Sequence, residues 1–160
     1  SDRRELVGRY ADTSRENFTN TMVISCFSFT EIANRAADLM PNGGSLLTLT
    51  YGGATRWVPS YNVMGVAKAA LEASVRYLAA DLGEQGIRVN AIAPGYVETE
   101  LNQEFWLTDA GKALIKRIPQ RRLGQLSDLD GPMLLLASEA SRYMTGAVLA
   151  VDGGHLVSSL

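Results

Sequence analysis

The stretch Gly43-Gly-Ser-Leu-Leu-Thr-Leu-Thr50 shows the pattern that decides the fold of this 160-residue chain. It is short and apolar and has glycines on both sides, which is typical of a strand buried in a sheet. A long amphipathic helix is predicted before it, from about Ser14 to Met40, with a capping box of Thr13 and Glu16 at its start. A second long helix, from about Tyr61 to Leu82, is predicted after it. The alternation predicts a parallel sheet covered by helices.

The second half of the chain continues this alternation, and together the elements indicate a Rossmann-like α/β fold with helices on both faces of a parallel sheet. Ligands in such sheets bind beyond the carboxyl ends of the strands, so the loops there are where we expect chemistry. The predicted strands are Ser45–Thr50, Ile87–Ala93 and Ala147–Val151, and the later helices are about Asp109–Arg117 and a helix that is capped by Ser127 and ends near Ser138.

Composition argues against several classes of partner. The formal charge of -2 and pI of about 5.4 come from scattered residues, so no basic stripe is available for nucleic acid. Apolar runs such as Met133–Ala137 are far shorter than the ~20 residues of a membrane helix, so we expect a soluble protein. The single cysteine, Cys26, lies among apolar residues, which indicates a buried thiol and a reducing, cytoplasmic setting. His155 is the only histidine, so we expect no metal site and interpret it as a surface or interface residue.

Tyr61 and Lys68 are a candidate catalytic pair. They lie seven residues apart at the start of a predicted helix, and seven residues make almost two turns, so both side chains leave the same face. An ammonium near a phenol favours the phenolate, so we expect the proton of Tyr61 to be donated and recovered more easily near neutral pH. Spacing alone favours a plainer interpretation, in which Tyr61 begins a helix and Lys68 is a solvated charge.

The setting of the pair changes that balance. The stretch Tyr51-Gly-Gly-Ala-Thr-Arg-Trp-Val-Pro-Ser-Tyr61-Asn-Val-Met64-Gly-Val-Ala-Lys68 resembles the active-site segment of short-chain dehydrogenases/reductases. Most members carry Tyr-x-x-x-Lys, whereas Met64 stands four residues before the lysine here. The Tyr-x6-Lys spacing, with Tyr51 where most members place a serine, resembles the bacterial enoyl-acyl-carrier-protein reductases. This match covers about residues 1–93.

From Pro94 onward the motifs resemble ordinary keto- or alcohol-oxidising members of the same superfamily. The stretch Pro94-Gly-Tyr-Val-Glu-Thr-Glu-Leu101 follows a predicted strand, where exposed amides and carbonyls can hold a carboxamide edge and Thr99 can reach a phosphate. The resemblance implies that Pro94, Gly95, Val97 and Thr99 fix the nicotinamide end of a cofactor. The alternative is a tight turn that starts a loop. We interpret Asp152-Gly-Gly154 as a turn, because no helix is predicted after it.

The resemblance implies an oxidoreductase of fatty acid synthesis that uses NADH, with NADPH as the open alternative. It would reduce the double bond of an enoyl thioester, carried on acyl carrier protein. Tyr61 would hydrogen-bond the developing enolate oxygen, Lys68 would hold the nicotinamide ribose, and Tyr51 would border the acyl pocket. Two alternatives remain. One is a carbonyl or alcohol dehydrogenase, which the residues after Pro94 favour. The other is a non-catalytic fragment that needs a partner half.

We expect a single domain over residues 1–160 that corresponds to the C-terminal, catalytic half of a Rossmann-fold reductase. The sequence shows no strand followed by a Gly-rich turn and a helix, so the N-terminal dinucleotide-binding half is expected to be absent. The helices Ser14–Met40 and Tyr61–Leu82 carry apolar residues on more than one face. The resemblance implies that these helices pair between copies in a homodimer or homotetramer.

Overall fold

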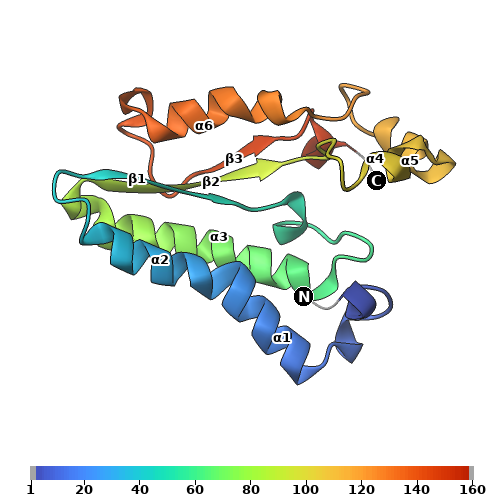
Figure 1. Cartoon of the computed structure of the whole chain (residues 1–160), viewed down its shortest axis with the longest axis horizontal. Coiled ribbons are helices and arrows are strands. Elements are labelled where there is room, and N and C mark those ends of the chain that lie inside the picture. Colours follow the sequence, from blue (N-terminus) through green and yellow to red (C-terminus); the bar gives the residue numbers. More distant parts are fainter. Residues whose placement is uncertain (1–2, 159–160) are drawn as a thin grey trace.

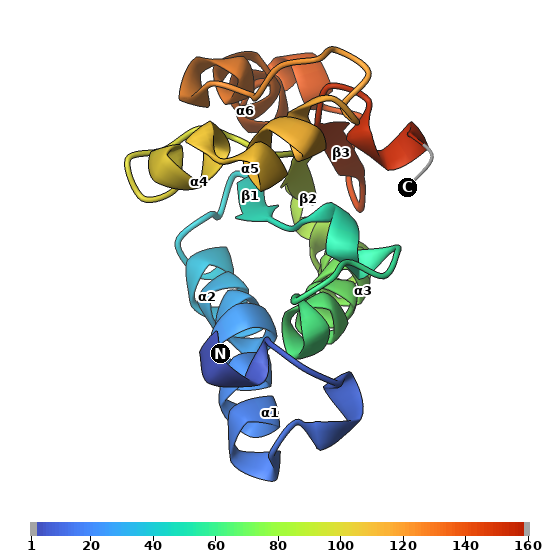
Figure 2. The same ribbon diagram turned by 90° about the vertical axis from the view of Figure 1, so that its right-hand side faces the viewer.

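The computed structural model describes residues 3–158, in which three parallel strands form one sheet. They are β1 (Gly44–Leu49), β2 (Ile87–Pro94) and β3 (Val148–Val151), in the spatial order β1-β2-β3. Helices α2 (Ser28–Ala37) and α3 (Asn62–Leu82) lie on one face of the sheet and α6 (Asp130–Ala137) lies on the other, whereas α4 (Gln103–Leu107) and α5 (Asp109–Ile115) lie beyond the carboxyl ends of the strands (Figures 1 and 2). The predicted Rossmann-like parallel sheet is therefore confirmed.

The first predicted helix is interrupted by a π-helical turn. It consists of α1 (Arg15–Met22), the π turn (Val23–Phe27) and α2 (Ser28–Ala37), and it ends before the predicted Met40. The Ser28 hydroxyl donates to the carbonyl of Ile24 at 2.7 Å. A hydroxyl bonded to the carbonyl four residues earlier competes with the regular ladder and bends helices.

The other helices lie close to their predicted positions, with differences at their ends. The last helix does not begin at Ser127, because a 3-10 turn (Leu126–Leu129) precedes it and a capping box of Gln125 and Asp128 holds that turn. The segment that follows Pro94 contains a short helix, Gln103–Leu107. The bounds are α3 (Asn62–Leu82), α4 (Gln103–Leu107), α5 (Asp109–Ile115) and α6 (Asp130–Ala137).

The core is built around β2, the central strand. Its residues are buried on both faces, which explains why its sequence is a nearly continuous apolar run. Val89 and Ala91 of β2 pack with Val75 and Ala79 of α3 in one cluster. Because α3 rests on the central strand through this cluster, the first turn of α3 is placed at the carboxyl end of the sheet.

Two residues singled out from the composition lie in the interior. Cys26 is buried as predicted, with its Sγ 3.5 Å from the Ser74 hydroxyl. His155 is only 8% exposed, so the surface, one of the two positions expected for it, is wrong. Its ring packs 4.8 Å from the Tyr96 ring, a contact between distant parts of the chain.

No helix within residues 3–158 has the length and apolar character that crossing a bilayer requires.

Asn90 is a fully buried polar side chain on the central strand. Its amide donates to the carbonyl of Met144 at 2.9 Å, and its carbonyl oxygen accepts from the backbone N–H of Ala147 at 3.0 Å. Both partners lie in the turn that leads into β3. Asn90 therefore joins the central strand to the edge strand through side-chain as well as ladder hydrogen bonds.

We predict that Asn90→Ala destabilises the protein by roughly 2–4 kcal/mol, because each buried backbone group left without a partner costs about 1–3 kcal/mol. Urea unfolding followed by circular dichroism measures this difference. The matched control is Asn20→Ala, an exposed position on α1, which should change stability by no more than about 0.5 kcal/mol. Equal transition midpoints for the two variants would show that the Asn90 bridge contributes little.

Candidate active site

The predicted pair, Tyr61 and Lys68, lies at the end of α3 that faces the carboxyl end of β1. Tyr61 is the residue directly before α3, and Lys68 follows Ala67, which is fully buried against the sheet. The Lys68 Nζ donates to the carbonyl oxygen of Leu49, the last residue of β1, at 2.9 Å. This hydrogen bond fixes the lysine over the strand end, where ligands of parallel sheets bind.

Met64 occupies the position where most short-chain dehydrogenases carry tyrosine. Its sulfur accepts a hydrogen bond from the Ser25 hydroxyl at 3.7 Å, within the π turn of the neighbouring helix. The Met64 side chain is thus engaged in packing between helices, and a thioether has no proton to donate. Tyr61 is therefore the nearest residue before Lys68 in the sequence that carries a phenol.

Tyr51 meets Tyr61 just beyond β1. The two rings pack edge to face, with centroids 5.0 Å apart and an interplanar angle of 65°. Glycine is required beside them, since a Cβ on Gly53 would approach the Tyr61 ring at 2.5 Å. Gly53, in the glycine-rich segment after Tyr51, therefore leaves room for the Tyr61 ring.

Burial dominates the titration of these groups. It raises the pKa of Tyr61 to about 12, and burial together with the neighbouring Tyr96 raises the pKa of Tyr51. Burial also lowers the pKa of Lys68. We expected the ammonium to lower the pKa of Tyr61, but the desolvation of its phenol determines the direction. Both tyrosines hold their protons at neutral pH and can act as hydrogen-bond donors.

The residues expected at a cofactor lie at the same end of the sheet, after β2. The Gly95 N–H donates to the carbonyl of Val151 at 2.9 Å. A Cβ on Gly95 would come within 2.7 Å of the Asp152 Cα, so glycine is what allows the ends of β2 and β3 to approach. Pro94, the residue before it, is the last of β2.

The chain then leaves the sheet through Val97 and Thr99. Val97 forms an isolated parallel bridge with Gly124. The Thr99 N–H donates to the Asn102 side chain at 2.8 Å, in the turn that precedes α4. Within residues 3–158 the Thr99 hydroxyl makes no hydrogen bond, so it is available to a ligand.

An aromatic wall that the sequence analysis missed adjoins these residues. Tyr96 packs against Tyr51, Trp106 and His155, with ring centroids 6.4, 5.2 and 4.8 Å away. Tyr96 directly follows Gly95 at the strand end, and an aromatic residue at that position was the one sequence feature that could have indicated this cluster. The ring contacts themselves join segments far apart in the sequence, so no local pattern predicts them.

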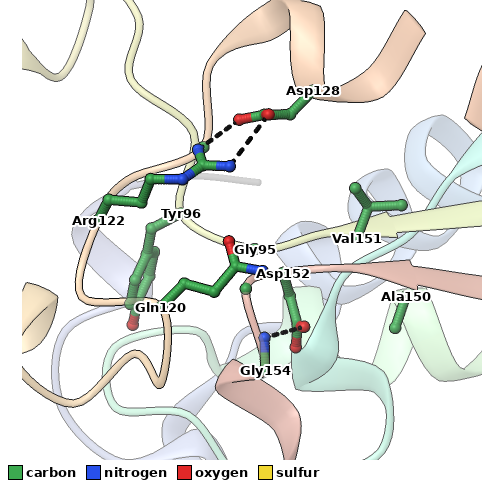
Figure 3. Close-up of a pocket in the computed structure, with 11 residues that line it drawn as sticks. Gly95, Tyr96, Gln120, Arg122, Asp128, Ala150, Val151, Asp152 and Gly154 are labelled. Carbon is green, nitrogen blue, oxygen red and sulfur yellow. Dashed lines mark hydrogen bonds and ion pairs between the residues drawn. The ribbon is translucent and has the colours of Figure 1, made fainter. Parts of the chain in front are cut away.

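Two hollows border this region. A cavity of about 380 Å³ lies between the ends of β2 and β3, with Tyr96 and Gln120 on its wall and the Arg122–Asp128 ion pair at its rim (Figure 3). A groove of about 390 Å³ lies beside Tyr61, and Tyr10 and Trp57 also line it.

The Asp152-Gly-Gly sequence forms the predicted turn at the first of these hollows. The Asp152 carboxylate accepts from the N–H groups of Gly154 and Leu156 at 2.8 and 2.7 Å (Figure 3 shows the first of these bonds). Its oxygens are thus occupied by the backbone of its own turn. Gly153 and Gly154 have φ values of 63° and 88°, which this turn requires and which glycine adopts freely.

Known proteins resemble this chain over its full length. The enoyl-(acyl-carrier-protein) reductase (NADH) 2 of Rhizobium meliloti strain 1021 is 56% identical over 163 residues, which cover 100% of this chain and 60% of the relative. The structure of enoyl-(acyl-carrier-protein) reductase from Anaplasma phagocytophilum in complex with NAD is 51% identical, with a TM-score of 0.89, and the match covers 100% of this chain and 59% of that one.

A third relative extends the comparison. The Bacillus cereus enoyl-acyl carrier protein reductase, solved with NADP+ and indole naphthyridinone, is 42% identical with a TM-score of 0.91, and the match covers 100% of this chain and 63% of that one. The chain thus spans about 60% of the length of its curated relatives. The family model described as enoyl-(acyl carrier protein) reductase matches residues 1–155, including the part after Pro94. The resemblance found in the sequence is confirmed, and the chain belongs to the enoyl-(acyl carrier protein) reductase family.

Proposed function

We propose that this chain provides the proton-donating half of an NADH-dependent reductase that acts on enoyl thioesters of acyl carrier protein in fatty acid synthesis. The observation that carries the proposal is the arrangement of Tyr51, Tyr61 and Lys68 at one end of the sheet, with Met64 turned into the helix packing. The names of the relatives support both the reaction and the cofactor.

The groups around the strand ends fit the nicotinamide end of a dinucleotide. The Lys68 ammonium has three donors, of which the Leu49 carbonyl occupies one, so it can also hold a ribose hydroxyl. Gly95 carries no side chain that would obstruct a close approach, and the Thr99 hydroxyl is available for a phosphate. Pro94 and Val97 contribute backbone around the same edge. A bound reduced nicotinamide supplies the hydride.

Tyr61 supplies the hydrogen bond that the reaction needs at the thioester oxygen. Its phenol is protonated at neutral pH, and burial extends this to higher pH by raising its pKa to about 12. A neutral donor held in place before the reaction stabilises negative charge as it develops on the substrate oxygen. Tyr51 packs edge-on against Tyr61 and would border the acyl chain. Met64 offers no proton at the position used by carbonyl-reducing relatives, which favours enoyl over carbonyl reduction.

We also propose that the protein is a cytoplasmic homodimer or homotetramer. Ile24 and Phe27 in the π turn and Tyr77 on α3 are 66%, 55% and 75% exposed. Large apolar side chains exposed on neighbouring helices favour self-association through these helices. The buried, unpaired Cys26 is consistent with a reducing compartment.

We predict that the native enzyme oxidises NADH with crotonyl thioesters and shows at least about 100-fold lower kcat/KM with small ketones, a difference of roughly 2.7 kcal/mol in transition-state binding. The loss of NADH absorbance measures both reactions, and NADPH in parallel tests the cofactor preference. Faster turnover of the ketone would favour a carbonyl reductase. The absence of any nicotinamide binding would favour a non-catalytic role.

We predict that affinity for NADH is lost at high pH as Lys68 loses its proton. The charged form of Lys68 binds the cofactor. Because burial lowers the pKa of Lys68, the loss of affinity should occur at a pH below the usual lysine pKa of about 10.5. Tyr61 is still protonated there. Lys68→Arg should retain affinity to higher pH, since a guanidinium stays charged above pH 12 or so.

Fluorescence titration of NADH binding across this pH range measures the effect. Lys68→Met should bind NADH about tenfold more weakly at neutral pH and show no alkaline loss. Lys112→Met, at an exposed position on α5, is the matched control and should follow the wild type. The assignment of Lys68 to the cofactor would be wrong if Lys68→Met and Lys112→Met behaved alike.

A further inference from the structure

The side chain of Asn62 joins two parts of the chain that are far apart in the sequence. Its amide nitrogen is 3.3 Å from the carbonyl oxygen of Glu5, 3.1 Å from that of Leu6 and 3.2 Å from that of Gly8, and it donates to this group of acceptors. Asn62 is the first residue of α3 and directly follows Tyr61. One amide therefore holds residues 5–8 beside the proton donor of the proposed reaction.

The same segment is fixed at its other side by helix α1. The Glu5 carboxylate accepts from the backbone N–H and the hydroxyl of Ser14, both at 2.9 Å, and from the Asn17 amide at 3.1 Å. Ser14 is the N-cap of α1. Residues 5–8 are thus held between the start of α1 and the start of α3, and they cannot shift without breaking hydrogen bonds at one of the two helices.

The backbone around Tyr61 needs such support. Ser60 and Asn62, on either side of the tyrosine, have φ values of 57° and 36°, in the left-handed region that non-glycine residues rarely adopt. Residues in sparsely populated regions cost about 1–3 kcal/mol each and persist only where the surroundings impose them. The Asn62 amide is bonded to a segment outside this turn, so it can impose the conformation.

The groove beside Tyr61 connects the hydrogen bonds of Asn62 with the space where a substrate would bind. Tyr61, Asn62 and Tyr10 all line it, and Tyr10 follows closely on the segment that Asn62 holds. A displacement of the segment would therefore move one wall of the groove together with the turn that presents the phenol.

We infer that Asn62 is a positioning residue for Tyr61: by binding the carbonyls of residues 5–8 it holds the strained turn and the adjoining groove wall in the arrangement that catalysis needs. This inference rests on the proposed function, because it assigns the phenol of Tyr61 to proton donation. Asparagine tolerates positive φ, so the competing explanation is that only the backbone conformation matters at this position.

Glycine substitutions separate these explanations. Asn62→Gly keeps the permitted backbone conformation and removes the amide, whereas Ser60→Gly relaxes the other flank and leaves the amide bonds in place. In the native enzyme we expect Asn62→Gly to lower kcat for a crotonyl thioester by about tenfold to 100-fold, since misplacing a reacting group by about 1 Å costs that much. The Kd for NADH and the thermal midpoint separate this effect from a loss of fold. Ser60→Gly should change kcat by less than about threefold.

A double-mutant cycle with Tyr61→Phe tests whether Asn62 acts through the phenol. In the Tyr61→Phe background, Asn62→Gly should cause no further loss of kcat, because the group that it positions is already gone. Asn62→Asp, which keeps the size and tolerates positive φ but donates no hydrogen bond, should repeat the result. Wild-type kcat in both Asn62 variants, or the same loss with and without the phenol, would overturn the inference. An inactive wild-type enzyme would instead contradict the proposed function.

Discussion

The hydrogen bond from the Lys68 ammonium to the carbonyl of Leu49 is the contact around which the candidate site is organised. It can form only if α3 crosses the sheet with its first turns at the carboxyl end of β1. The packing of Val75 and Ala79 on the central strand fixes the position of α3 along the sheet. The same placement brings Tyr61 to the strand end, against Tyr51. Core packing thus determines the position of the polar groups.

Small residues leave space for these polar groups, and burial determines their protonation. Gly53 accommodates the Tyr61 ring, and Gly95 allows the ends of β2 and β3 to approach. Burial raises the pKa of both phenols and lowers the pKa of the lysine. The site therefore combines neutral donors, suited to an oxygen that gains charge, with a cation whose charge depends on pH.

Patterns within one segment were predictable from the sequence, and contacts between segments were not. The strand Ile87–Pro94 was predicted almost to its ends because it is buried on both faces and apolar throughout. The helix Ser14–Met40 was predicted without its π turn, since the Ser28 hydroxyl bond to Ile24 has no periodic signal. The burial of His155 was not predictable, because its packing on Tyr96 joins distant loops.

We propose that Tyr61, and not the residue four positions before Lys68, supplies the proton-donating phenol. Single-turnover rates of crotonyl thioester reduction for Tyr61→Phe and Met64→Tyr test it most directly. We expect Tyr61→Phe to lower the rate by about 100-fold or more while the Kd for NADH stays unchanged, and Met64→Tyr to add no carbonyl reduction. An unchanged rate in Tyr61→Phe together with new ketone reduction in Met64→Tyr would show that Tyr61 is not the proton donor.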